Sequence, residues 1–181
     1  DNRVRHMDYG VQFNKLMYER LLSGGDITLF SPHDVPDVYD AFYADQDLFK
    51  ELYERAERNT KLRKKTVKAI DLFSAFTQER KDTGRIYLMN VDHANTHGSF
   101  RPEVAPVKQS NLCCEIDLPT KPLEHINDEN GEIALCTLSA INWGSFRNPE
   151  DMQKACTLAL RGLDALLSYQ RYPIVAAELA T

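Results

Sequence analysis

A chain of 181 residues, 43% of them hydrophobic, is long enough to bury one sizeable core. The formal net charge of -5 disfavours a general nucleic-acid binder, because such proteins normally carry a basic face. No apolar run approaches the roughly 20 residues of a membrane span, and the charged first residues lack the apolar core of a signal peptide. The four cysteines match no zinc spacing, so we expect reduced thiols in a cytoplasmic protein.

Hydrophobic spacing predicts the elements of the first half of the chain. We expect a helix over residues 8–22, which the glycines after it terminate, and a short buried strand over 27–30. Two helices rich in aromatic and acidic residues should follow at 36–44 and 46–58, and a longer helix at 62–82.

The second half alternates strands with polar connections. A helix followed by a short apolar strand, repeated along the chain, is typical of α/β folds with parallel strands. The expected elements are a strand at 85–91, a long connection at 92–110, strands at 111–118 and 132–141 around a turn at 127–131, a helix at 149–169 and the start of another at 178–181.

Three polar residues are spaced to share one face of the strand predicted at 111–118. Asn111, Cys113 and Glu115 alternate with Leu112 and Cys114, and alternate side chains of a strand point to opposite faces. The pattern would bring a thiol, a potential base and an amide together. It fits equally well an edge strand with a solvated polar face and a core cysteine.

The other cysteines and the histidines give weaker signals. Cys136 lies in the middle of an apolar strand, and Cys156 lies on the apolar face of the last long helix, where we expect it in the core. His93 and His97 could share a metal ion on a helix. Their surroundings predict a strand end and a loop, so we expect no metal site.

Motifs along the whole chain resemble class I ribonucleotide reductase large subunits. The closest likeness is to the finger-loop segment of that family, at Gln109–Cys113, Glu115 and Asp117–Thr120. The other matching segments, in order, are Arg5–Gly10, Asp26–Val35, Thr83–Tyr87, Asn90–His93 and Asn127–Ala140.

The resemblance implies a role for each matched site residue. Cys113 would become a thiyl radical that takes the 3′ hydrogen of the ribose, and Glu115 would be the general base for the 3′ hydroxyl. Asn111 would orient the sugar, with Ser110 and Glu115 also contributing to substrate binding. Cys136 would be one of two redox-active cysteines that end as a disulfide.

The partner of Cys136 is missing from this chain. The family places it upstream, yet no cysteine precedes Cys113. Cys114 is a poor substitute, because a disulfide between adjacent residues is strained and strand alternation turns Cys114 away from the site. We expect Cys114 to have a packing role.

The implied fold is α/β, part of a ten-stranded α/β barrel with a central finger loop at about residues 105–118. Residues 1–181 would form a partial catalytic barrel domain. Because a partial barrel leaves strand edges and apolar faces open, the isolated chain should be unstable or associate, and should lack turnover. The first residue is not Met and the chain stops within a predicted helix, so we expect both ends to be cuts.

The implied function is radical-based reduction of ribonucleoside diphosphates to deoxyribonucleotides. The expected partners are a metal-containing, radical-generating small subunit, thioredoxin or glutaredoxin as reductant, the remainder of the large subunit and a second copy of that subunit. We expect no cofactor bound by this chain, no nucleic-acid partner and no membrane. Alternatives are a related glycyl-radical reductase, or an inactive or split-gene piece that functions only when assembled with other chains.

Overall fold

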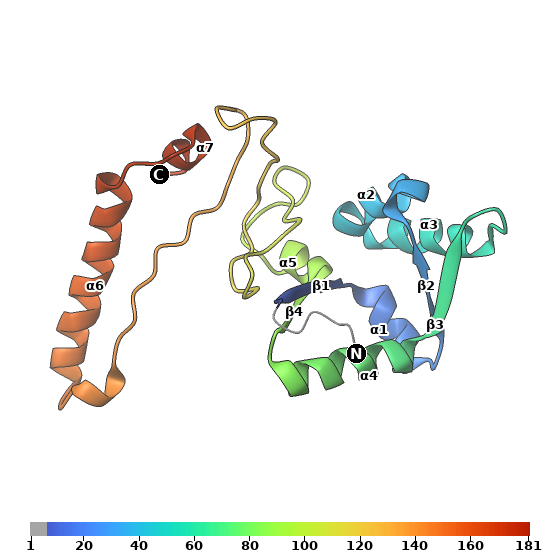
Figure 1. Ribbon diagram of the computed structural model, residues 1–181, viewed down its shortest axis with the longest axis horizontal. Coiled ribbons are helices and arrows are strands. Elements are labelled where there is room, and N and C mark those ends of the chain that lie inside the picture. The colour runs from blue at the N-terminus through green and yellow to red at the C-terminus, as the bar shows by residue number, and fades with distance from the viewer. Residues whose placement is uncertain (1–6) are drawn as a thin grey trace. The chain divides into compact units, whose positions relative to one another are not determined.

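The computed structural model describes residues 7–181, which divide into two compact units (Figure 1). The first ends at Pro119, and the second runs Thr120–Thr181. The first contains β1 (Tyr9–Phe13), α1 (Lys15–Leu22), β2 (Asp26–Phe30), the 3-10 turn η1 (Pro32–Asp34), α2 (Pro36–Ala44), α3 (Gln46–Arg58), β3 (Lys64–Lys68), α4 (Ala69–Thr83), β4 (Ile86–Asn90) and α5 (Val91–Thr96). The second contains η2 (Trp143–Ser145), α6 (Pro149–Tyr169) and α7 (Val175–Leu179). The Arg5–Gly10 motif begins outside the described residues.

Two pairs of strands give the first unit its α/β character. β1 and β4 are parallel, with Phe13 opposite Asn90, whereas β2 and β3 are antiparallel, with Ile27 opposite Val67. The α/β class is therefore confirmed. Residues 7–181 form no closed barrel.

The predicted helix at 8–22 is wrong over residues 8–14, nearly its first half. Residues Tyr9–Phe13 form β1, and α1 begins only at Lys15 after the cap residue Asn14. The side-chain oxygen of Asn14 accepts a hydrogen bond from the amide of Met17, at 3.4 Å, as an N-cap does. The backbone of β1 pairs with β4, and the buried Phe13 ring packs on Tyr18, Phe73 and Phe76, so tertiary contacts override the local helical spacing.

The predicted helix at 62–82 is also wrong at its start. Residues Lys64–Lys68 form β3, and α4 occupies only Ala69–Thr83. Thr66 and Val67 are β-branched and pair with β2, which favours a strand. Gly84 ends α4 at φ 65°, a left-handed conformation that suits glycine, so the predicted end of that helix is confirmed.

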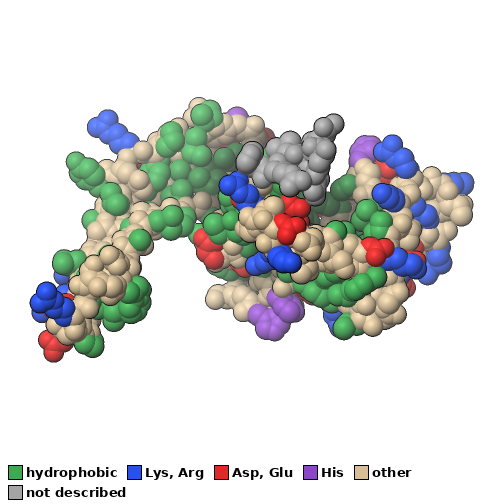
Figure 2. Space-filling view, turned by 60° about the horizontal axis from the view of Figure 1, so that its bottom comes forward, with side chains coloured by type: hydrophobic (Ala, Val, Ile, Leu, Met, Phe, Trp, Pro, Cys, Tyr) green, Lys and Arg blue, Asp and Glu red, His purple; other side chains and the backbone are tan. Residues whose placement is uncertain are grey.

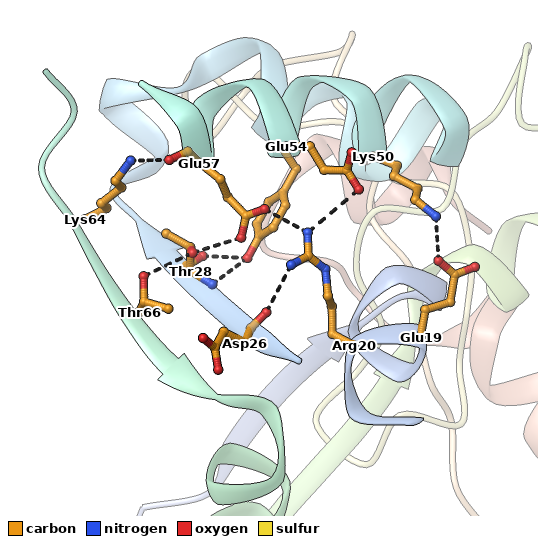
Figure 3. Close-up of polar contacts among 10 residues, drawn as sticks. Glu19, Arg20, Asp26, Thr28, Lys50, Glu54, Glu57, Lys64 and Thr66 are labelled. Atoms are coloured by element: carbon orange, nitrogen blue, oxygen red, sulfur yellow. Dashed lines mark hydrogen bonds and ion pairs between the residues drawn. The ribbon is translucent and has the colours of Figure 1, made fainter. Parts of the chain in front are cut away.

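A polar network ties the β2–β3 pair to α3 (Figure 3). The Arg20 guanidinium lies 2.7 Å from a Glu57 carboxylate oxygen, and the other oxygen of Glu57 accepts a hydrogen bond from the Thr28 hydroxyl at 2.9 Å. The Tyr53 hydroxyl accepts from the Thr28 amide at 2.7 Å and donates to the Thr28 carbonyl at 2.8 Å. A single buried tyrosine therefore satisfies both backbone groups of Thr28.

Tyr53→Phe should loosen β2 locally. It leaves two buried backbone groups of Thr28 without a partner, a cost of about 1–3 kcal/mol. We expect the amides of a peptide covering residues 26–30 to exchange about tenfold faster than in the unaltered protein, measured by hydrogen–deuterium exchange mass spectrometry. Tyr39→Phe, at an exposed tyrosine of α2, is the control and should leave that exchange unchanged. Equal exchange in both variants would contradict the assigned role of Tyr53.

The second unit has one long helix with little cover. α6 begins where predicted, with Pro149 in its first turn and the Asn148 side chain accepting from the amide of Asp151 at 2.9 Å. No residue of α6 is buried, and Figure 2 shows hydrophobic side chains on its surface, at the left of the view. Among residues 7–181, no helix has the length and apolar character to cross a membrane.

The strand predicted at 132–141 is wrong. Only Glu132 takes part in strand pairing, in an isolated antiparallel bridge with Lys121. A strand requires a neighbour for its backbone groups, and the described residues of the second unit supply none beyond this bridge.

Candidate functional site: the turn at residues 111–116

A closed turn at residues 111–116 replaces the strand predicted at 111–118. The Asn111 amide donates to the Ile116 carbonyl at 3.3 Å, and the Cys114 amide donates to the Asn111 carbonyl at 3.1 Å. The Asn111 side-chain oxygen also accepts from the amides of Glu115, at 3.1 Å, and Ile116, at 3.0 Å. Asparagine side chains compete with strand pairing in this way, so the predicted strand is wrong.

The turn presents its two cysteines differently. Cys113 is exposed, and so is Glu115. Cys114 is half-buried against the cluster of Met89, Val91 and Val107, so its predicted packing role is confirmed. The reason differs from the one predicted, because Cys114 has a φ of 63° in the turn instead of alternating along a strand.

Asn111 closes the turn with one end of its side chain and keeps the other end available. Its oxygen holds the amides of Glu115 and Ile116, whereas its Nδ2 donates to no other described residue. The Ser110 hydroxyl donates to the Asn111 carbonyl at 3.0 Å. The turn is thus internally braced, while a thiol, a carboxylate and an amide donor are free to meet a ligand.

A second carboxylate lies just beyond the turn. Desolvation raises the pKa of Asp117 above the ordinary value of an aspartate. A carboxyl with a raised pKa is a candidate for proton transfer, so Asp117 has to be distinguished from Glu115 by experiment.

The remaining cysteines lie in the second unit. Cys136 is exposed in a segment without regular structure, and its redox role stays a prediction. Cys156 is exposed on α6, so its predicted core position is wrong. The physical reason is that no residue of α6 is buried in the described part of the chain, so the helix contributes no side chain to a core.

The segment around His93 and His97 is helical and not the predicted loop. His93 lies on α5, His97 caps it, and their ring centroids are 5.1 Å apart. Residues 7–181 contain no group of three or more His, Cys, Asp or Glu side chains arranged to hold a metal ion.

Two amide side chains that contact the loop were missed by sequence reasoning. Gln12 on β1 and Asn95 on α5 hydrogen-bond to the backbone at Lys108 and Val107. Nothing in the sequence spacing of Asn95 relates it to residue 107. These contacts place the loop at the carboxyl ends of the parallel strands β1 and β4, where α/β folds commonly carry their sites.

A cavity of about 400 Å³ also lies in the first unit, and Gln12 is among the residues that line it. Mostly apolar side chains of β1, β2 and α1–α3 line it, and none of the predicted site residues does. Its lining does not suit a charged or heavily hydroxylated ligand, so the exposed turn is the stronger candidate.

Sequence comparison decides the family. A family model described as the barrel domain of ribonucleotide reductase matches residues 1–181. The chain belongs to this family. Among its relatives, ribonucleoside-diphosphate reductase subunit alpha of Haemophilus influenzae is 66% identical over 178 residues, which cover 98% of this chain and 24% of that protein.

Two other relatives show how widely the likeness extends. Ribonucleoside-diphosphate reductase 1 subunit alpha of Escherichia coli is 67% identical over 122 residues, which cover 67% of this chain and 16% of that protein. Ribonucleoside-diphosphate reductase subunit alpha of Enterobacteria phage T4 is 46% identical over 183 residues, which cover 99% of this chain and 24% of that protein. The chain therefore spans about a quarter of the length of these relatives or less.

Proposed function

We propose that the protein containing this chain reduces ribonucleoside diphosphates to deoxyribonucleoside diphosphates. The observation that carries the proposal is the exposed Cys113 thiol on the turn closed by Asn111, in a chain that matches the ribonucleotide reductase barrel family throughout. The three relatives described above are each named subunit alpha of a ribonucleoside-diphosphate reductase, which supports the same conclusion.

Hydrogen transfer begins at Cys113. Its sulfur, as a thiyl radical, takes the hydrogen from C3′ of the ribose, which forms an S–H bond and leaves the unpaired electron on C3′. The Asn111 Nδ2 donates to a sugar hydroxyl while its oxygen keeps the turn closed. Ser110 contributes to the same substrate contact, and orientation of this kind can supply much of the rate enhancement.

Proton transfer follows at Glu115. Its carboxylate accepts the 3′ hydroxyl proton while a thiol of the redox pair protonates the 2′ oxygen, which leaves as water. Cys136 and a second cysteine from the rest of the subunit supply two electrons and two hydrogens in total and become a disulfide, and the S–H of Cys113 returns its hydrogen to C3′, which regenerates the thiyl radical. The radical comes from a metal-containing small subunit, and thioredoxin or glutaredoxin returns the disulfide to thiols.

The surrounding assembly follows from the same family relationship. We propose that residues 1–181 are part of a ten-stranded α/β barrel, with residues 105–118 as its central finger loop. The full subunit forms a homodimer in the cytoplasm and works with the small subunit. The pair formed by β1 and β4 has no further strand at either edge among the described residues, and no residue of α6 is buried. Both observations support the proposed barrel, because a barrel would supply neighbouring strands and helices.

Glu115→Gln tests the proposed chemistry. In the full-length subunit, assayed with the small subunit and thioredoxin, it should lower kcat for reduction of a ribonucleoside diphosphate by about 10²- to 10⁴-fold, because the general base is lost. Asp117→Asn is the matched control and should change kcat by only a few-fold. The reverse pattern would transfer the role of base to Asp117, and full activity in both variants would refute base catalysis from this loop.

A further inference from the structure

The stem of the finger loop, defined as Val107 and Lys108, is held by two amide side chains from separate elements. Asn95 on α5 contacts the backbone of Val107, and Gln12 on β1 contacts the carbonyl of Lys108. Neither Gln12 nor Asn95 belongs to the 111–116 turn. Both lie at the carboxyl end of the β1–β4 pair, so the loop is attached at two points to the most regular part of the first unit.

Asn95 pairs with both backbone groups of Val107. Its Nδ2 donates to the Val107 carbonyl at 2.8 Å, and its oxygen accepts from the Val107 amide at 2.8 Å. The same Nδ2 donates to the Val91 carbonyl at 2.8 Å, which fixes the amide plane within α5. Asn95 and Val107 are both buried, so water cannot replace these bonds. Only a side chain with a donor and an acceptor can make this pairing.

Gln12 makes the second attachment and is itself fixed. Its Nε2 donates to the Lys108 carbonyl at 2.7 Å, and its oxygen accepts from the Tyr43 hydroxyl at 3.0 Å. The Lys108 ammonium lies 5.9 Å from the centroid of the Tyr43 ring, a distance that allows a cation–π contact. Residue 108 is therefore held by its backbone and by its side chain.

Few residues separate the stem from the reactive thiol. Only Gln109 and Ser110 separate Lys108 from the hydrogen-bonded turn that starts at Asn111. On the far side of Cys113, the side chain of Cys114 packs on the cluster that contains Val107. The thiol thus projects from a turn that is braced internally and anchored on both sides.

We infer that Asn95 and Gln12 are positioning residues, which set the place of the Cys113 sulfur relative to the substrate C3′ without touching the substrate. The inference rests on the proposed function. Hydrogen transfer depends steeply on the distance between donor and acceptor, and a displacement of about 1 Å can cost about 100-fold in rate. Releasing the stem should therefore slow hydrogen transfer while the surfaces that bind the substrate elsewhere remain intact.

Asn95→Asp and Gln12→Leu in the full-length subunit, assayed with its small subunit, test this inference. The aspartate would keep the shape of the side chain but place a carboxylate against the Val107 and Val91 carbonyls. The leucine removes the bond to the Lys108 carbonyl together with the acceptor of the Tyr43 hydroxyl. We expect kcat to fall by about 10- to 100-fold with KM for the nucleoside diphosphate within a few-fold. The isotope effect on kcat with substrate deuterated at C3′ should increase, because hydrogen transfer becomes the slower step.

Asn14→Ala is the matched structural control. Asn14 is also a buried asparagine, but its side chain caps α1 and donates to the Gln46 side chain at 2.9 Å instead of bonding to the loop. It should lower the melting temperature and leave the isotope effect unchanged. Partial unfolding of any variant should also leave the isotope effect unchanged, because fewer active molecules reduce only the apparent kcat. A larger isotope effect therefore distinguishes mispositioning of Cys113 from loss of folded protein.

The outcomes separate the two proposals. A lower kcat with a larger isotope effect in either folded variant supports positioning by that residue. Unaltered kcat in both, or a lower kcat with an unchanged isotope effect in both, overturns it. Gln12→Leu keeps the test decisive if Asn95→Asp does not fold. Activity that survives in Cys113→Ser would instead refute the proposed function, whatever the stem variants do.

Discussion

Cys113→Ser should abolish deoxyribonucleotide formation in the reconstituted full-length enzyme. Serine preserves the size of the side chain and the exposed turn that carries it. Its O–H bond is, however, much stronger than the S–H bond of cysteine, so a radical cannot be generated there at a comparable cost. The assay is chromatographic detection of the deoxyribonucleoside diphosphate, and we expect no product above background.

Cys114→Ser is the control for this experiment. The two residues are adjacent, but Cys114 packs on Met89, Val91 and Val107 while Cys113 is exposed. Its hydroxyl would be only partly desolvated, so the variant should retain turnover within a few-fold of the unaltered enzyme. Product formation by Cys113→Ser, or loss of it in Cys114→Ser alone, would contradict the assignment of the radical to Cys113.

Cys136→Ser should stop turnover at a later step. Without the Cys136 thiol the two-electron reduction cannot end in a disulfide, so product formation with thioredoxin should fall to background. The first hydrogen transfer should survive, because it requires only Cys113. Its signature is loss of tritium from C3′ of a labelled substrate into water, since a thiol exchanges its hydrogen with the solvent.

Cys156→Ser provides the comparison within the same unit. Cys156 is also exposed, but it lies on α6 and matches no motif of the family resemblance. It should keep both product formation and tritium release at the level of the unaltered enzyme. If Cys136→Ser also retained product formation, the redox role of Cys136 would be wrong, whereas loss of tritium release would give that residue an earlier role.

The elements predicted correctly have strong local end signals. α2 and α3 begin and end where the sequence predicted them. Pro36 lies in the first turn of α2, and the Asp45 side chain accepts hydrogen bonds from the amides of Asp47 and Leu48 at the start of α3. Asn148 does the same for α6, and Gly84 ends α4. These signals act over three or four residues, so they can be recognised without knowledge of the fold.

The candidate site was predicted in part. The residues of the 111–116 turn were identified from their pattern and from the family resemblance, but their shared face was derived from a strand that does not exist. The Asn111 side chain forms a local turn with its own neighbours, and strand alternation has no place in it. The packing of Cys114 was expected, but its conformation at φ 63° was not.

By itself, the sequence determined the family, through a match along the whole chain. It also determined the capped helices and the chemical types present in the turn, which depend on residues close together in the chain. Only the tertiary structure decided that residues 9–13 and 64–68 are strands, because their partners lie about 77 and 40 residues away. It also decided that Asn95 and Gln12 hold the stem beneath Cys113. Side chains that satisfy the backbone of a distant loop have no sequence period, since their spacing is set by how the chain folds back and not by any repeat along it.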